Sequence, residues 1–153
     1  MKPNIISRLS TLTGEYSGEG VNHEKQPFRG RLALQPLLGG AGIQLSFRAI
    51  GEDGCNFHEE ITTIAPDLEG EIGLYNLNTN MPGLVRHRLT QESTSPEGIE
   101  RAIFAFGDRT DAQNFREEIT IELHPNGGLG YRYAWGMPGG DFADRSGLVM
   151  RRA

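Results

Sequence analysis

The residues best suited to contact a small molecule lie on one short stretch of the chain, where aromatic side chains recur at every second position. Tyr131, Tyr133 and Trp135 alternate with Arg132 and Ala134, so their rings share one face if the stretch is a β-strand. Such a row forms a continuous apolar wall that also carries hydroxyl and indole donors. The pattern predicts either a packed barrel core or the wall of a ligand pocket, and in a barrel these two roles overlap.

One histidine is placed to act as a polar anchor beside such a wall. His87 stands between Val85 and Leu89 in an alternating pattern, while Arg86 and Arg88 occupy the opposite face. We therefore expect the imidazole to point inward. There it could anchor a ligand, bind a metal or haem iron, or hydrogen-bond to a neighbouring residue.

A tyrosine on the preceding strand is the expected partner of this histidine. Tyr75 shares a strand face with Leu77, and we expect that face to be the apolar, inward one. Tyr75 and His87 are therefore predicted to line the barrel interior together as ligand-binding anchors.

A histidine and a carboxylate two residues apart offer an acid–base alternative. His58 and Glu60 share one face of a predicted strand, with Glu59 on the other. The two groups, about 7 Å apart along a strand, could serve as general acid and base of a small isomerase or hydrolase. If their face points outward, they are ordinary solvated side chains. Metal binding is not predicted, because the four histidines lie on separate predicted strands without the short spacing of a ligand set.

The chain carries no other signature of an enzyme. No serine stands in a Gly-x-Ser-x-Gly elbow, and neither a phosphate-loop pattern nor a dinucleotide fingerprint is present. The only cysteine is Cys55, so an internal disulfide is excluded. We therefore assign no catalytic residue and expect a binding protein rather than an enzyme.

Ten short strands are predicted to position these residues. Period-two alternation, interrupted by tight turns such as Asn126-Gly127 and Gly139-Gly140, favours strands that pair antiparallel with their sequence neighbours. A long meander of this kind removes its exposed edges most simply by closing into a barrel. The predicted strands span residues 15–22, 29–37, 43–50, 56–64, 71–78, 84–92, 99–106, 115–123, 129–136 and 145–151.

The start of the chain has helical rather than strand periodicity. Apolar residues occupy positions 5, 6, 9 and 12, behind a capping residue at Asn4, which predicts a short amphipathic helix over residues 4–12. We expect this helix to cap one end of the barrel. The polar segment 79–83 joins two strands and is expected at a barrel mouth.

Composition limits the partners of the protein. The 153 residues fit one domain spanning 1–153, with a capping helix at 4–12 and a barrel at 15–151. The net charge of −5 argues against nucleic acid and anionic membranes as partners, because both require a basic surface. Neither a secretory signal nor a membrane-spanning stretch is recognisable. We expect a cytoplasmic monomer or homodimer.

Three motifs carry a resemblance to a known family. Gly14-Glu15-Tyr16-Ser17-Gly18-Glu19-Gly20 is similar to a Gly-Thr-Trp-x-Gly-x-Gly opening, Phe57-His58-Glu59-Glu60 to a Leu-His-x-Glu strand, and Asn80-Met81-Pro82-Gly83-Leu84-Val85 to a Pro-Thr-Gly-Leu-Val/Ile stretch. Together with the element order, they resemble the nitrobindin-like group of the fatty-acid-binding-protein-like calycins.

The resemblance implies a lipocalin-like barrel and makes haem a candidate ligand. In this group a histidine within the last strands holds the haem iron, whereas the present chain has no histidine after His124. His87 or His124 would have to replace that ligand. We therefore predict no cofactor and retain haem binding as an alternative.

Taken together, these observations predict an all-β, calycin-like meander barrel of about ten strands with an N-terminal helical cap. Its interior is expected to bind a small, mainly apolar ligand of unknown identity, with Tyr131, Tyr133 and Trp135 as the wall and His87 and Tyr75 as anchors. The alternatives are haem binding, catalysis by the histidine–glutamate pair, and a filled barrel that acts through its surface.

Overall fold

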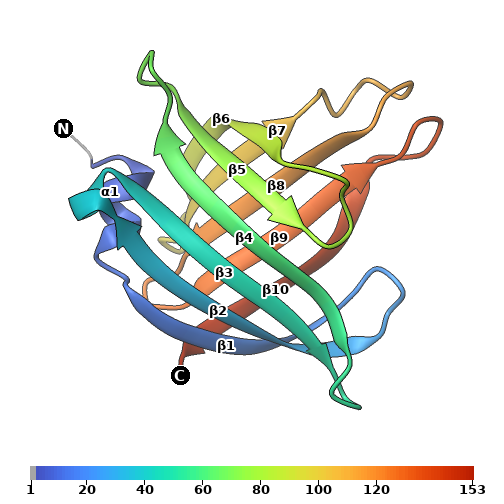
Figure 1. The fold of residues 1–153 in the computed structure, drawn as a ribbon, viewed down its shortest axis with the longest axis horizontal. Coiled ribbons are helices and arrows are strands. Elements are labelled where there is room, and N and C mark those ends of the chain that lie inside the picture. The colour runs from blue at the N-terminus through green and yellow to red at the C-terminus, as the bar shows by residue number, and fades with distance from the viewer. Residues whose placement is uncertain (1–2) are drawn as a thin grey trace.

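The computed structural model describes residues 3–153, and its ten antiparallel strands close into a barrel (Figure 1). Each strand pairs with its sequence neighbours, and β1 pairs with β10 to close the sheet. The prediction of an all-β meander barrel is confirmed, and the ends of all ten strands lie within two residues of the expected ones. The strands are β1 (Gly14–Val21), β2 (Pro27–Leu37), β3 (Gly42–Gly51), β4 (Asn56–Pro66), β5 (Ile72–Asn78), β6 (Val85–Thr94), β7 (Glu100–Phe106), β8 (Arg116–Leu123), β9 (Leu129–Gly136) and β10 (Ala143–Arg152).

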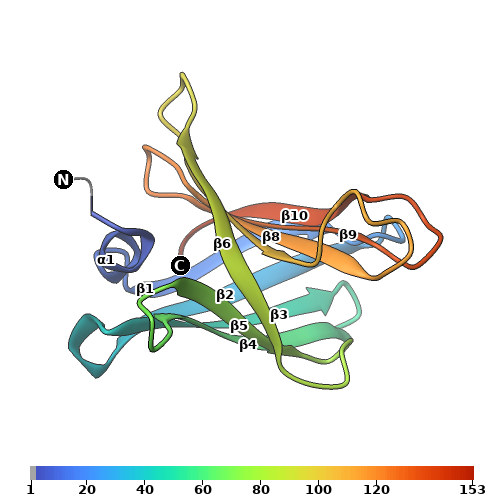
Figure 2. The ribbon, with the colours of Figure 1, turned by 90° about the horizontal axis from the view of Figure 1, so that it is seen from above.

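The predicted N-terminal helix forms and covers one end of the barrel. Helix α1 (Ile5–Ser10) begins at Asn4, whose side-chain oxygen accepts a hydrogen bond from the Ser7 amide at 2.9 Å. Ile5 and Leu9 are fully buried, and the helix packs against β2 and β3 (Figure 2). Burial of this apolar stripe, about 1.5–3 kcal/mol for each large side chain, holds the helix in place.

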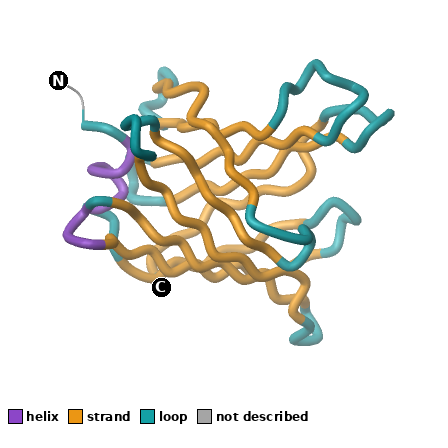
Figure 3. Tube along the Cα trace, turned by 45° about the horizontal axis from the view of Figure 1, so that its top comes forward, coloured by secondary structure: helices purple, strands orange, loops and turns teal. Residues whose placement is uncertain are grey.

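The two ends of the barrel differ in how they are covered. Helix α1 and the 3₁₀ turn η1 (Leu38–Gly40) lie together at one end, whereas the longer loops lie at the other (Figure 3). Among the helices of residues 3–153, none has the length and apolar character needed to cross a bilayer. The helix-capped end is filled by packed side chains, so any entrance to the interior must lie at the loop end.

Period-two alternation fills the interior as predicted. On β3, for example, Ile43, Leu45 and Phe47 are buried, while Arg48 is exposed. The same alternation on the other strands produces one continuous core. A single sheet can bury one face in this way because an antiparallel sheet can have one buried face and one solvent-exposed face.

The seam between β1 and β10 depends on a glycine. A Cβ on Gly18 would lie 2.4 Å from the Val149 carbonyl oxygen and 3.1 Å from the Met150 Cα, and these backbone atoms cannot move without opening the barrel. We expect Gly18→Ala to destabilise the protein by about 1–3 kcal/mol, as overpacked sites do. Urea denaturation measures this cost, with Ser17→Ala as the neighbouring control. Equal midpoints for the two variants would contradict a steric requirement at the seam.

Candidate functional site

The predicted aromatic row lies on β9 and faces the barrel interior. Tyr131 is buried, and Tyr133 and Trp135 lie progressively closer to the loop end. The rings of Tyr131 and Tyr133 meet edge to face with centroids 5.6 Å apart, and the Phe47 ring on β3 lies 5.6 Å from that of Tyr131. The expected orientation of the row is therefore confirmed, and Phe47 extends the wall across the barrel.

These rings enclose a cavity of about 330 Å³ at the loop end. Residues of the β1–β2, β5–β6 and β9–β10 loops surround its entrance, including Asn80 and Met81 of the segment expected at the mouth. The size lies at the lower end of the range for small-molecule sites. The side chains that define its walls are Phe28, Phe47, Ala49, Phe57, His58, Glu117, Tyr131, Tyr133, Trp135 and Leu148.

A buried polar network lies behind this aromatic wall. Glu60 is 4% exposed, and its Oε2 accepts hydrogen bonds from the Tyr133 hydroxyl and, at 2.7 Å, from the Asn76 amide. The same amide donates to Thr62 Oγ1 at 2.8 Å. Hydrogen bonds to a charged acceptor are the stronger kind, so the network fixes the position of the Tyr133 ring in the wall.

Burial and charge keep both interior tyrosines protonated. Desolvation raises the pKa of Tyr131 well above its usual value of 10, and the negative charge of Glu60 adds to the effect. The pKa of Tyr133 is raised for the same two reasons. The Tyr131 hydroxyl is fully buried and interacts with Thr62, Tyr133 and Glu60, so it belongs to the polar network behind the wall.

The predicted pair of His58 and Glu60 is brought together, with only one member in the cavity. His58 Nε2 lies 3.5 Å from Glu60 Oε2, and His58 lines the cavity whereas the Glu60 side chain lies behind Tyr133. The Asn80 amide nitrogen is 3.0 Å from His58 Nδ1, and because an amide nitrogen only donates, Nδ1 accepts. In that tautomer Nε2 carries the hydrogen, and although it lies 3.5 Å from Glu60 Oε2 it makes no hydrogen bond within residues 3–153.

His87 points inward, as predicted, but its partner is different from the expected one. It is completely buried, and its Nε2 lies 2.7 Å from Oε1 of Glu117. Glu117 lines the cavity whereas His87 does not. Glu117 was not predicted as a site residue, although it stands two residues before Ile119 on the same face of β8. This spacing is the sequence feature from which an inward orientation of Glu117 could have been predicted.

Tyr75 does not join the site, and the expectation that it faces the interior is wrong. On β5 the buried positions are Leu74 and Asn76, which places Tyr75 on the outer face. Its ring lies under the guanidinium of Arg86 at 5.9 Å. The register pairs Leu74, not Tyr75, with His87. Asn76 takes the inward position because Glu60 and Thr62 satisfy its amide.

Trp135 stands at the entrance and is held there by charged and aromatic neighbours. The Arg145 guanidinium lies 4.4 Å above its ring, and Arg145 Nε donates to the Trp135 carbonyl at 3.0 Å. His23 from the β1–β2 turn packs edge to face against the same indole at 5.8 Å. The entrance therefore consists of a flat ring supported from two sides.

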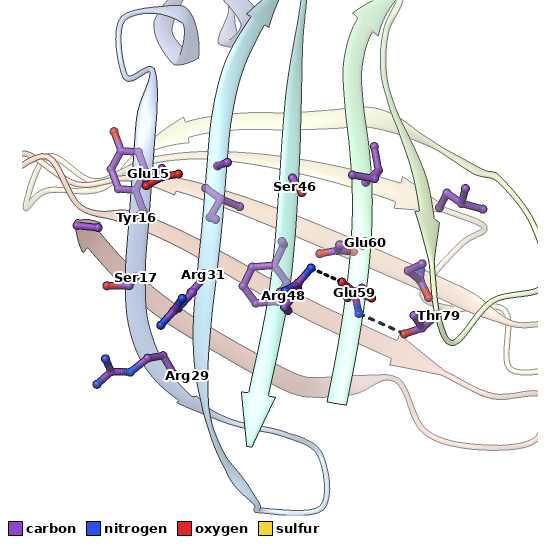
Figure 4. Close-up of a pocket in the computed structure, with 17 residues that line it drawn as sticks. Glu15, Tyr16, Ser17, Arg29, Arg31, Ser46, Arg48, Glu59, Glu60 and Thr79 are labelled. Carbon is purple, nitrogen blue, oxygen red and sulfur yellow. Dashed lines mark hydrogen bonds and ion pairs between the residues drawn. The ribbon is translucent and has the colours of Figure 1, made fainter. Parts of the chain in front are cut away.

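A second, larger depression of about 820 Å³ lies on the outer face of β1–β5. Figure 4 shows Arg29, Arg31 and Arg48 among the residues that line it, with Arg48 paired to Glu59 at 2.7 Å. The Glu59 amide donates to Thr79 Oγ1 at 3.3 Å in the same region. This depression is broad, open and lined by solvated charges, so it lacks the enclosed apolar wall of the interior cavity.

Comparisons with known proteins support the fold. No protein-family model and no curated protein matches the chain. Rv2717c from M. tuberculosis, known from a crystal structure, has a similar fold with a TM-score of 0.71 and 14% identity, over 99% of both chains. A de novo designed fluorescence-activating β-barrel aligns with a TM-score of 0.43 and 12% identity over 94% of this chain and 96% of that one. The likeness to Rv2717c shows a shared barrel fold, and membership of the calycins stays a prediction.

Proposed function

We propose that this protein reversibly binds a small molecule with a flat, mainly apolar body in the interior cavity. The observation that carries the proposal is the aromatic wall of Tyr131, Tyr133 and Trp135, which together with Phe47 lines a cavity of about 330 Å³. Small-molecule sites combine such an apolar lining with a few fixed polar groups. The Glu117 carboxylate, which lines the cavity, supplies one of these groups.

The polar anchors differ from those first expected. Tyr75 lies outside the barrel and has no part in the proposed site. His87 acts through Glu117, whose carboxylate it holds at 2.7 Å and which itself lines the cavity. The ligand would thus contact Glu117 while His87 positions that side chain.

Filling the cavity should abolish binding. Ala49 is 5% exposed and lines the interior, so Ala49→Leu adds bulk inside the wall. We expect it to lower the affinity for the neutral probe N-phenyl-1-naphthylamine by more than about tenfold, equivalent to about 1.4 kcal/mol. Quenching of Trp135, the only tryptophan, measures binding, and native mass spectrometry of the purified protein tests for a ligand that is already bound.

The same substitution on the opposite face is the control. Ala33 lines the outer depression, and Ala33→Leu should leave probe binding unchanged, with thermal melts confirming that both variants are folded. Loss of binding in Ala33→Leu alone would move the site to the outer depression. Absence of binding by the unmodified protein to any apolar probe would overturn the proposal.

Haem is a less suitable occupant. A haem iron needs an imidazole nitrogen directed into the cavity, yet His87 is buried off the lining with Nε2 on Glu117. His124 lies 3.4 Å from Glu122 on another part of the sheet. Within residues 3–153, no three potential metal ligands gather at one place. His87 and His124, the iron ligands that the resemblance would require, therefore do not suit a haem bound in this cavity, whose lining histidines are His23 and His58.

A further inference from the structure

We infer that the preferred occupant of the cavity is an organic cation, with a flat apolar body and a protonated amine directed at Glu117. This inference rests on the proposed function, because it specifies the chemical class of the ligand for the same cavity. It follows from the charges on the lining, the aromatic faces and a carboxylate oxygen that the described residues leave without a hydrogen bond.

Glu117 is the buried carboxylate that a ligand would meet directly. The residue is 6% exposed and lines the cavity. Its Oε1 is 2.7 Å from His87 Nε2, whereas its Oε2 has no hydrogen bond to any described residue. This oxygen is not among the fully buried, unpartnered side-chain atoms of the described residues, so it is accessible from the cavity. An ammonium group, which has only donors, would satisfy it.

The rest of the lining adds negative potential and offers little to an anion. Glu60 lies directly behind Tyr133 and places a second carboxylate near the wall. Among the described lining residues the one arginine or lysine is Arg145. Its guanidinium already stacks on Trp135 and donates to the carbonyl oxygens of Trp135 and Asp141. An anionic ligand would therefore approach two carboxylates with no free guanidinium to pair with.

The aromatic wall is itself suited to a cation. Tyr131, Tyr133 and Trp135, with Phe47 and Phe57 opposite, present several rings to one enclosed space. The π-faces of such rings attract ammonium groups, more strongly when the site is desolvated. The effect of the carboxylates is visible at the tyrosines: Glu60 raises the pKa of Tyr131, and Glu60 together with Glu117 raises that of Tyr133, beyond the effect of burial alone.

Three probes with one aromatic body test the inference. 1-Naphthylmethylamine is a cation at neutral pH, 1-naphthalenemethanol is neutral and 1-naphthaleneacetic acid is an anion. Isothermal calorimetry gives their affinities, and the single indole N–H resonance of Trp135 reports occupancy of this cavity by NMR. We expect the cation to bind at least about tenfold more tightly than the alcohol, and the acid to bind most weakly.

A charge-removing substitution locates the preference. Glu117→Gln keeps an oxygen that can accept from His87 but removes the charge, so it should reduce cation affinity to that of the alcohol and leave the alcohol unchanged. Glu118→Gln, on the outer face of the same strand and paired with Arg109, is the matched control and should change neither. Because the three probes are first compared on the unmodified protein, the test stands even if the variant folds poorly.

The outcomes separate the two proposals. Equal binding of all three probes, or a preference for the acid, would overturn the cation assignment while supporting a small-molecule cavity. Failure of every probe to shift the Trp135 resonance would overturn both. A cation preference that persists in Glu117→Gln would place the charge recognition elsewhere and contradict the role of this carboxylate.

Discussion

Replacing Glu117 by methionine should destabilise the protein by about 1–3 kcal/mol, the typical cost of leaving a buried hydrogen-bonding group without its partner. The His87 ring is completely buried, and its hydrogen bond to Glu117 at 2.7 Å is the only one that it makes within residues 3–153. Without that carboxylate, both ring nitrogens of His87 would be buried and unpaired. Replacing His87 by leucine should cost a similar amount, because it leaves the carboxylate without its donor.

The double replacement should cost less than either single one. With both partners apolar and of similar volume, no polar group is left behind, and such exchanges are often neutral or stabilising. Urea denaturation of the four proteins gives the coupling free energy directly. The exposed pair of Arg109 and Glu118, joined at 2.6 Å on the outer face, is the control, and its coupling should stay below about 1 kcal/mol. Additive costs at His87 and Glu117 would contradict the view that they act as one buried unit.

The orientation of most interior side chains could be read from the sequence. The alternation of apolar and polar residues predicts inward-facing side chains for His87, Tyr131 and Tyr133. Successive side chains of a strand point to opposite faces of the sheet, and in a barrel only the inner face is buried. The ends of the strands could also be predicted from the sequence, because glycine-containing turns separate nearly every pair of strands. These features are local, and each is determined by residues close in sequence.

The partners of those side chains could not be read in the same way. His87 on β6 and Glu117 on β8 are 30 residues apart, and β7 lies between their strands in the sheet. Their contact depends on strand register and barrel closure, which period-two patterns do not encode. Glu117 was overlooked because a carboxylate is not normally expected on a dry face, even though its spacing from Ile119 pointed inward.

Tyr75 illustrates where alternation fails. On β5 each face carries an apolar residue beside a polar one: Leu74 with Asn76, and Tyr75 with Leu77. Hydrophobicity therefore does not determine which face of β5 points into the barrel, and hydrogen bonding determines it instead. Asn76 is fully buried because its amide reaches Glu60, whereas Leu77 is left 51% exposed on the outside. The interior polar network, not the apolar pattern, sets the orientation of this strand.

The same network explains why the barrel keeps a cavity at one end only. At the helix-capped end the interior is packed with aliphatic side chains such as Leu9, Leu34 and Met150, each at most 2% exposed. Toward the loop end, Glu60 and Glu117 are anchored to the barrel wall by Tyr133 and His87. Side chains fixed at the wall by directional bonds cannot collapse inward, so the space between the aromatic rings stays open.

The loop that borders this space depends on one buried arginine. Arg116, at the start of β8, is 3% exposed. Its Nη1 donates to the Met137 carbonyl at 2.9 Å, and its Nη2 donates to the Gly140 carbonyl at 2.7 Å. Met137 lines the cavity. The guanidinium therefore ties the β9–β10 turn to the adjacent strand, directly beside the entrance.

Arg116→Met should destabilise the protein by roughly 2–4 kcal/mol, because it removes two charge-assisted hydrogen bonds made by a buried guanidinium. Lysine should rescue only part of this loss, since a single ammonium cannot reproduce the fork of a guanidinium. Urea denaturation measures the cost, with the exposed Arg88→Met as control, which should stay within about 0.5 kcal/mol of the unmodified protein.

Hydrogen exchange of individual amides distinguishes a local role of Arg116 at the β9–β10 turn from a general contribution to stability. The Gly139 amide donates to the Ala112 carbonyl at 2.7 Å and the Gly140 amide to the Met137 carbonyl at 2.9 Å, so both amides should exchange with solvent faster in Arg116→Met. Amides of β3, on the far side of the barrel, should change their exchange rates only with the global free energy of unfolding. Because the turn borders the entrance, probe affinity should fall together with the local protection. Uniform acceleration of exchange across all strands, with probe binding unchanged, would show that Arg116 stabilises the barrel as a whole rather than the mouth of its cavity.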